Sequence, residues 1–136
     1  MLVTTSDLSV GRGCLAHLVS DDEQNWTELE PEFVSDTADE PECPDYFEYK
    51  GKYYMLYSIC GKAHYKYSDE PFGAWITPDE PIIECGNVPK CAIWNDRIIF
   101  TGFKPIRGYA GECVFVEVTA DEKGLLHTKP VPEMTV

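Results

Sequence analysis

The sequence predicts an all-β protein that forms a portion of a β-propeller. Short runs rich in aromatic and β-branched residues are bounded by Gly, Pro, Asn or Asp, as strands usually are. No stretch of useful length shows the 3.6-residue period of an amphipathic helix. A pattern of strand, turn and strand recurs after 45 residues. Repeats of 45 to 50 residues with about four short strands each are typical of propeller blades.

The expected strands follow one another along the chain. The clearest apolar runs cover residues 53–59, 98–103 and 113–118. In the last of these runs three valines share one face, with Phe115 and Glu117 on the other, which is the period of two that a strand requires. When residues 44–49 are placed over 89–94, the following turns coincide, and so do the hairpin arms YYMLYS and IIFTGF. The two units are therefore expected to be repeats.

An incomplete unit precedes the two repeats. Residues 15–26 resemble residues 64–75, since both contain a Ser-Asp step and a Trp. We therefore divide the single domain, residues 1–136, into a half blade at 13–30 with two strands, a blade at 42–84 and a blade at 87–131. This amounts to about two and a half blades of four strands. A β-sandwich would use the same strands but would not predict the 45-residue offset.

Composition limits the partners. The chain has 136 residues, of which 43% are hydrophobic and 26% charged, as in a globular domain. Its net charge of −13 argues against nucleic acid or an anionic membrane as partner, and a neutral or cationic ligand fits better. The first residues, MLVTTSDLS, lack the order of a signal peptide. We expect a cytoplasmic location, unless an export segment has been removed.

The six cysteines form no CxxC pair. His17 and His64 each lie close to one cysteine, but no second pair completes a ligand set, so we expect neither a metal site nor a cofactor. Cys60, Cys91 and Cys113 lie in apolar or strand-like runs, where free cysteine usually behaves as a small buried hydrophobe. Disulfides remain an open alternative.

Glu42 is the candidate catalytic residue. It directly precedes the expected innermost strand of the first full blade, and Asn87 takes the corresponding place in the next blade. A carboxylate at this place would point toward the propeller axis, where ligands are held. Between prolines and a cysteine it would lose hydration, which favours the protonated form that a general acid needs. The alternative is a solvated acid, since residues 36–45 are acidic throughout.

The stretch ECPDYFEYKGKYYMLYS resembles the general-acid segment of glycoside hydrolase family 32, the invertase, levanase and inulinase family. In that family a Glu-Cys-Pro-Asp step opens the third blade of a five-bladed propeller. The preceding HLVSDDEQNWTELEP resembles the outer strands of the family's second blade. The related family 43 glycosidases share the architecture and the glutamate, usually without Cys-Pro-Asp. The resemblance covers residues 13–103, and ECPD is its one fairly specific motif.

The resemblance implies a glycosidase that, when complete, acts on β-fructosides by a retaining double displacement. Glu42 would be the acid/base, Cys43 would tune it, and Asp45 would hold a structural hydrogen bond or position the segment. Retaining enzymes need two carboxylates about 5 Å apart. The family's Asn-Asp-Pro nucleophile motif and its Arg-Asp-Pro motif do not occur here. We therefore expect little or no hydrolysis by this chain alone, which is either part of a longer hydrolase or a half-propeller that has lost catalysis.

The candidate substrate-binding residues are Tyr46, Trp75, Trp94 and Arg107, with Tyr109 as a further ring near a strand end. For the rings the alternative is packing between blades, and for Arg107 it is loop capping. The alternative function is a non-catalytic carbohydrate-binding or structural β module. A buried Glu42 would favour the hydrolase, and an exposed one the module. Carbohydrate is thus the expected partner, while exposed sheet edges favour oligomers or a propeller half supplied by another segment.

Overall fold

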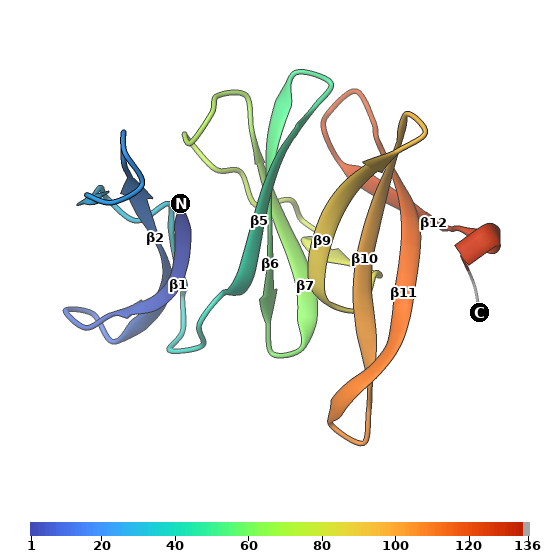
Figure 1. Cartoon of the computed structure of the whole chain (residues 1–136), viewed down its shortest axis with the longest axis horizontal. Coiled ribbons are helices and arrows are strands. Elements are labelled where there is room, and N and C mark those ends of the chain that lie inside the picture. The colour runs from blue at the N-terminus through green and yellow to red at the C-terminus, as the bar shows by residue number, and fades with distance from the viewer. Residues whose placement is uncertain (135–136) are drawn as a thin grey trace.

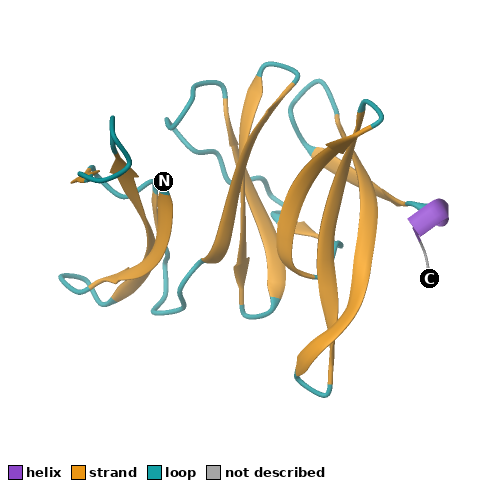
Figure 2. Ribbon diagram, viewed as in Figure 1, coloured by secondary structure: helices purple, strands orange, loops and turns teal. Residues whose placement is uncertain are grey.

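Three antiparallel sheets stand side by side in the molecule (Figure 1). The computed structural model describes residues 1–134, except for the side chains of Tyr109 and Ala110, so the prediction for the Tyr109 ring falls outside the described residues. Nearly all regular structure is strand, and the short 3₁₀ turn η1 (Pro132–Met134) is the one helical element described (Figure 2). Within the described part of the chain, no helix has the length and apolar character needed to span a membrane.

The N-terminal sheet consists of β1 (Leu2–Asp7), β2 (Arg12–Val19), β3 (Thr27–Glu28) and β4 (Phe33–Val34). β1 occupies one edge of β2, while β3 and β4 share the other edge in line, so the sheet is three rows wide. It therefore extends beyond the half blade predicted at 13–30. The segment LVTTSD lacks apolar alternation and is only partly buried, which hides it from sequence reasoning. Its continuous pairing with β2 makes it a strand.

The other two sheets are four-stranded meanders, as predicted. The middle sheet contains β5 (Glu42–Tyr49), β6 (Lys52–Ile59), β7 (Lys62–Ser68) and β8 (Ile82–Ile83) in that order. The C-terminal sheet contains β9 (Asn87–Trp94), β10 (Arg97–Ile106), β11 (Tyr109–Ala120) and β12 (Leu126–Pro130) in that order. The chain is therefore an all-β portion of a β-propeller, with each sheet as a blade.

The 45-residue repeat is visible in the turns. Lys50 and Gly51, between β5 and β6, have φ angles of 52° and 74°, and Asn95 and Asp96, between β9 and β10, have 48° and 59°. Positive φ at both central residues is the signature of the type I′ turn, whose twist matches that of the flanking strands. Gly51 adopts this conformation without steric cost, and Asn and Asp tolerate it better than most residues.

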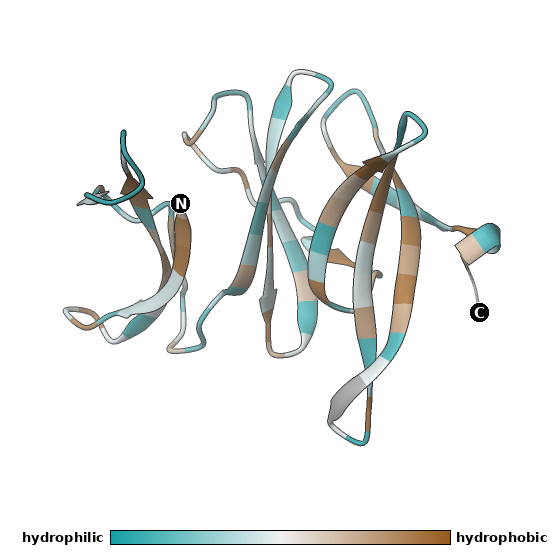
Figure 3. Ribbon diagram, in the orientation of Figure 1, coloured by the Kyte–Doolittle hydropathy of each residue, from teal (hydrophilic) through white to brown (hydrophobic). Residues whose placement is uncertain are grey.

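The middle sheet is covered on both faces, because alternate residues of β6 point to opposite sides. Tyr54 and Leu56 pack toward the C-terminal sheet, in a cluster with Ile98, Phe100 and Val118. Met55 and Tyr57 pack toward the N-terminal sheet around Leu15. In Figure 3 the turns between β5 and β6 and between β9 and β10 are hydrophilic, while long stretches of β10 and β11 are apolar.

All six cysteines are free. The expectation that Cys60, Cys91 and Cys113 are buried holds only in part, because Cys60 and Cys113 are exposed and Cys91 is half-buried. Cys60 lies in the tight turn after β6, where its φ is 51°, and not in the apolar strand that precedes it. Cys85 is buried, and burial raises the pKa of its thiol to about 12.

Candidate active site

A β-bulge opens the innermost strand of the middle sheet. Glu42 pairs with Ser58 and Asp45 with Leu56, so the strand gains a residue between them, and Cys43 has a φ of 52°. The same irregularity opens β9, where Val88 has a φ of 53°. Bulges turn side chains in new directions and are frequent beside active sites. The two bulges place Glu42 and Asn87 at the same end of neighbouring inner strands.

We call this end the mouth face. It comprises the starts of β5 and β9 and the turns at residues 8–11, 60–61 and 107–108, all of which lie along the lower edge of Figure 1. The connector that leads to Glu42 is fixed to β1, because the Thr4 hydroxyl donates to the Pro41 carbonyl (2.9 Å). It also runs directly against Gly13, where a Cβ would meet the carbonyl of Asp39. Sequence reasoning missed this role of Gly13.

Glu42 is exposed, contrary to the expectation that its neighbours bury it. Pro41 is buried, but Cys43 is exposed and Pro44 only half-buried, so the flanking residues do not enclose the carboxylate. The described residues therefore leave the Glu42 side chain open to solvent.

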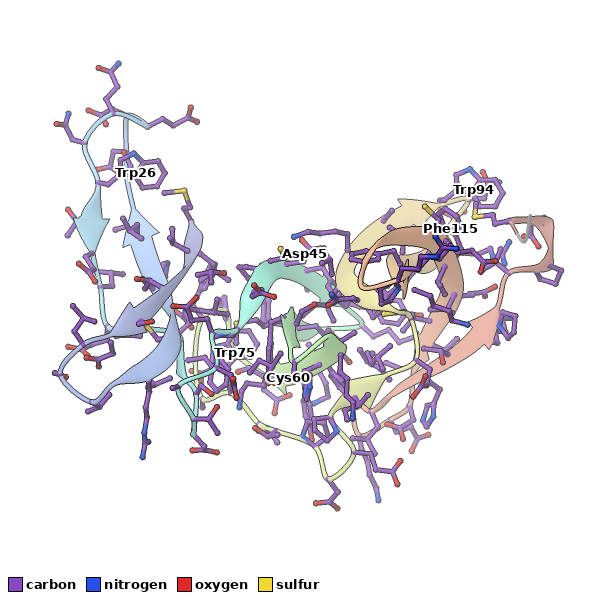
Figure 4. The ribbon with its side chains drawn as sticks, turned by 90° about the horizontal axis from the view of Figure 1, so that it is seen from below. Trp26, Asp45, Cys60, Trp75, Trp94 and Phe115 are labelled. Atoms are coloured by element: carbon purple, nitrogen blue, oxygen red, sulfur yellow. The ribbon has the colours of Figure 1, made fainter. Side chains whose placement is uncertain are left out.

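Asp45 joins the two inner strands. Its Oδ2 accepts a hydrogen bond from the backbone N–H of Cys91 (2.6 Å), and its Oδ1 accepts one from the N–H of Tyr46 (3.1 Å). Beside it, the Lys90 ammonium donates to the carbonyls of Cys43 (3.1 Å) and Pro44 (2.7 Å). In Figure 4 Asp45 lies at the inner strand of the middle sheet, next to the C-terminal sheet. These bonds hold the backbone directly after Glu42.

Both bulges are held by hydrogen bonds from residues that sequence reasoning did not single out, Ser58 and Lys90. The buried Ser58 hydroxyl accepts a hydrogen bond from the N–H of Val88 (2.8 Å), which links the middle sheet to the second bulge. The Asn87 side chain also accepts from that N–H (2.9 Å). No motif marks these residues, because each forms its hydrogen bond with a partner at least 30 positions away in sequence.

Tyr46 and Trp75 lie together, but on the opposite face of β5 from the Asp45 carboxylate. Their rings meet edge to face at 6.2 Å, and Tyr46 stacks on Phe72 at 4.5 Å. Tyr46 is four residues along β5 from Glu42, which corresponds to about 13 Å at the usual rise of a strand. Figure 4 shows Trp75 between the N-terminal and middle sheets. The two rings therefore belong to the contact between these sheets.

A buried carboxylate organises this contact, and sequence reasoning missed it. Glu32 lies 2.6 Å from Nδ1 of His17, and both side chains are 10% exposed or less. Its other oxygen accepts a hydrogen bond from the indole N–H of Trp75 (2.7 Å). His17 also stacks on Phe72 at 4.8 Å. Among the surrounding acids of residues 28–32 no sequence signal distinguishes Glu32.

Trp94 and Arg107 lie apart from these residues. Trp94 ends β9, seven residues and about 23 Å from Asn87 at the usual strand rise, and the Arg97 guanidinium lies over its ring at 5.8 Å. Arg107 is exposed in the hairpin turn after β10, at the mouth face. The structure thus places Arg107 and Glu42 on one face, Tyr46 and Trp75 between two sheets, and Trp94 at the far end. Among the described residues, no three His, Cys, Asp or Glu side chains form a metal-binding group.

Comparison with known proteins shows a likeness in fold. No family model and no curated protein match the sequence. The GH32 β-fructofuranosidase of Bombyx mori superposes with a TM-score of 0.68 at 18% identity, over 98% of this chain and 34% of that one. The xylan β-1,4-xylosidase of Bacillus halodurans gives 0.61 at 16% identity, over 93% and 32%. The α-L-arabinofuranosidase of Clostridium thermocellum gives 0.54 at 13% identity, over 96% and 52%.

These identities establish the fold alone. The chain spans about a third of the length of the first two structures. The predicted resemblance to families 32 and 43 is confirmed at this level, since the matching structures include glycosidases of both families. The chain therefore has a glycosidase-like propeller fold.

Proposed function

We propose that this chain is the part of a propeller glycosidase that carries the general acid, and that Glu42 is that acid. The observation that carries the proposal is the bulge at the start of the inner strand β5, which places a carboxylate at the mouth face. The equivalent bulge of β9 presents Asn87, so the carboxylate is specific to one blade. The fold match to glycoside hydrolases supports the proposal.

In this mechanism the Glu42 carboxyl donates its proton to the leaving glycosidic oxygen, and the resulting carboxylate then deprotonates the attacking water. Asp45 and Lys90 are positioning residues, because they hold the backbone after Glu42 through β9. A second carboxylate about 5 Å away is needed as nucleophile. Since the family's nucleophile motif is absent from the sequence, we propose that another segment supplies it. The ECPD step favours β-fructosides as the substrate class.

The exposure of Glu42 favours a second candidate function. A non-catalytic carbohydrate-binding or structural module has no need of a desolvated carboxyl, and Glu42 is exposed. Neither a hydrogen bond nor an ion pair engages its side chain within residues 1–134. The two functions differ in what a change at Glu42 does to sugar that is bound at the mouth face.

The test combines binding with hydrolysis. Wild type, Glu42→Gln and Glu48→Gln are titrated with short inulin oligosaccharides, with arabino-oligosaccharides for comparison, while backbone amide shifts are followed by NMR. Glu48 is an exposed carboxylate on the same strand, close to its other end, and serves as the matched control. We expect saturable shifts at residues 42–45 and 87–90 with the fructan, altered by Glu42→Gln and unchanged by Glu48→Gln.

Aryl β-fructoside hydrolysis is measured on the same three proteins, and we expect little or none. Activity that disappears in Glu42→Gln would show that the chain itself supplies the nucleophile. Equal activity in wild type and Glu42→Gln would contradict the proposed role of Glu42. If the amide shift changes caused by the oligosaccharide were the same in wild type and Glu42→Gln, the result would support the binding module instead.

A further inference from the structure

Lys66 lies in the contact between the N-terminal and middle sheets. It is directly opposite Met55 in the pairing of β7 with β6, so both side chains leave the same face of the middle sheet. Met55 is fully buried in the apolar cluster toward the N-terminal sheet, and Phe33 and Trp75 pack against that cluster. The half-buried Lys66 side chain therefore runs along an apolar surface.

The Lys66 amino group lies over an aromatic ring. Its Nζ is 4.4 Å from the ring centroid of Phe33 and donates a hydrogen bond to the Thr77 hydroxyl (2.5 Å). Among the described residues no carboxylate comes within ion-pair distance of this amine, whereas Lys52 on the neighbouring strand pairs with an acid. Burial lowers the pKa of Lys66, although the negative charge of Asp36 acts in the opposite direction. The surroundings thus favour the neutral amine more than water does.

A cavity of 440 Å³ opens beside this amino group, between the N-terminal and middle sheets. Its aromatic lining consists of Phe33, Phe72 and Trp75. The carboxylates that line it are Glu30, which is exposed, and Glu32, whose two oxygens already have partners. The volume is within the range of small-molecule sites. The cavity can therefore hold a small ligand with a flat apolar part next to the amine.

We propose that Lys66 is a covalent binding site for an aromatic aldehyde, which condenses with its amino group to form an imine in this cavity. The neutral amine attacks the carbonyl carbon, so a C–N bond forms and the carbonyl oxygen takes up a proton. Both amine hydrogens finally leave with that oxygen as water, and the reaction needs no oxidant or reductant. The Thr77 hydroxyl is placed to pass a proton from nitrogen to oxygen.

The rings around the cavity favour an aromatic aldehyde over an aliphatic one, because aromatic pairs gain stability beyond the burial of their area. A lysine desolvated among apolar groups is a typical nucleophile toward carbonyl compounds. In the register of the middle sheet Lys66 lies level with Tyr46, away from the mouth face. The site is therefore separate from Glu42 and does not rest on the proposed glycosidase function.

The experiment measures how fast benzaldehyde labels each lysine of the full chain. Sodium cyanoborohydride at neutral pH reduces the imine to a stable benzylamine, and peptide mass spectrometry follows the labelled fraction of every lysine over time. The reference is Lys62, the exposed lysine at the start of the same strand. We expect Lys66 to react about tenfold faster than Lys62, a factor that corresponds to about 1.4 kcal/mol. With propanal, which has no ring, this preference should be smaller.

Substitutions in the cavity test the site itself. Phe33→Leu keeps an apolar side chain but removes the ring, so it should reduce the difference between benzaldehyde and propanal at Lys66. Thr77→Val, at an exposed position, removes the hydroxyl and should slow labelling of Lys66 but not of Lys62, while Thr77→Ser should restore it. Amide spectra recorded by NMR check that each variant is folded.

Labelling in the order of exposure, with Lys62 before Lys66, would overturn the proposal. An equal preference for Lys66 with both aldehydes would also overturn it, because the rings would then contribute nothing to binding. No outcome depends on sugar hydrolysis.

Discussion

The two contacts that the middle sheet makes with its neighbours are built differently. Toward the C-terminal sheet it buries a continuous apolar cluster from both sheets, centred on Leu56 and Phe100. Toward the N-terminal sheet the buried cluster has three members, Leu15, Met55 and Tyr57. There the contact is completed by Glu32 with His17 and Trp75.

The two contacts hold the sheets together by different interactions. Apolar area is non-directional, so the contact between the middle and C-terminal sheets tolerates small shifts. The contact with the N-terminal sheet depends on a buried carboxylate, whose two partners must stay in place. Since the connector to Glu42 is bonded to β1, the contact with the N-terminal sheet helps to position the candidate acid, together with the bonds of Asp45 and Lys90 between β5 and β9.

The largest effect is expected from Phe100→Ala. Phe100 is fully buried between the middle and C-terminal sheets, and Phe47 meets its ring edge to face at 5.5 Å. Loss of the ring leaves a cavity and should lower the free energy of unfolding by about 4 kcal/mol. Urea unfolding followed by circular dichroism measures this. Phe115→Ala, at a half-buried ring on β11, is the control and should cost far less. Equal losses of stability in the two variants would contradict the larger contribution expected from the apolar contact around Phe100.

A smaller and more local effect is expected from Glu32→Ala. It leaves the imidazole of His17 and the indole N–H of Trp75 without their buried partner, which should cost about 3 kcal/mol. Hydrogen exchange should rise in β1 and β2 and remain slow in β10 and β11. Glu30→Ala removes an exposed acid two residues away and is the matched control. A uniform rise over all three sheets would mean that the sheets unfold as one unit and that the two contacts do not differ in strength.

Much of the architecture can be predicted from the sequence, because repeats and apolar alternation are visible in the order of the residues. The 45-residue offset predicts the two four-stranded sheets, and the turns at Lys50-Gly51 and Asn95-Asp96 repeat it in their dihedral angles. β1 escaped prediction because LVTTSD has no apolar period, and its pairing with β2 is what makes it a strand.

The candidate site is less predictable because burial is a tertiary property. The motif ECPD correctly marks the start of an inner strand, but the exposure of Glu42 depends on which elements surround it. In the sequence Glu32 is not distinguishable from the neighbouring acids, because its partners His17 and Trp75 approach it only in the folded chain. Tyr46 and Trp75 do approach one another, yet as part of the contact between sheets.

The smallest effect is expected from a buried phenol on each side of the middle sheet. Tyr54 faces the C-terminal sheet and Tyr57 the N-terminal sheet, and burial raises the pKa of both phenols to about 12. The folded chain thus holds these protons more tightly than the unfolded chain, whose tyrosines titrate near 10. Stability from each phenol is fully present below pH 10 and is lost as the pH rises toward 12.

Phenylalanine has no proton to lose, so Tyr57→Phe should change little at pH 7 and should reduce the loss of stability between pH 10 and 12. Tyr54→Phe should reduce that loss too, but it also removes the hydrogen bond from the Tyr54 hydroxyl to the Gly124 carbonyl (3.2 Å). That bond is worth about 1 kcal/mol at neutral pH. Urea unfolding at pH 7 and pH 11 measures both variants. If Tyr57→Phe lost as much stability between pH 7 and pH 11 as the wild type, ionisation of Tyr57 would not be the cause of that loss. The contact with the N-terminal sheet would then lack the pH dependence that its buried phenol predicts.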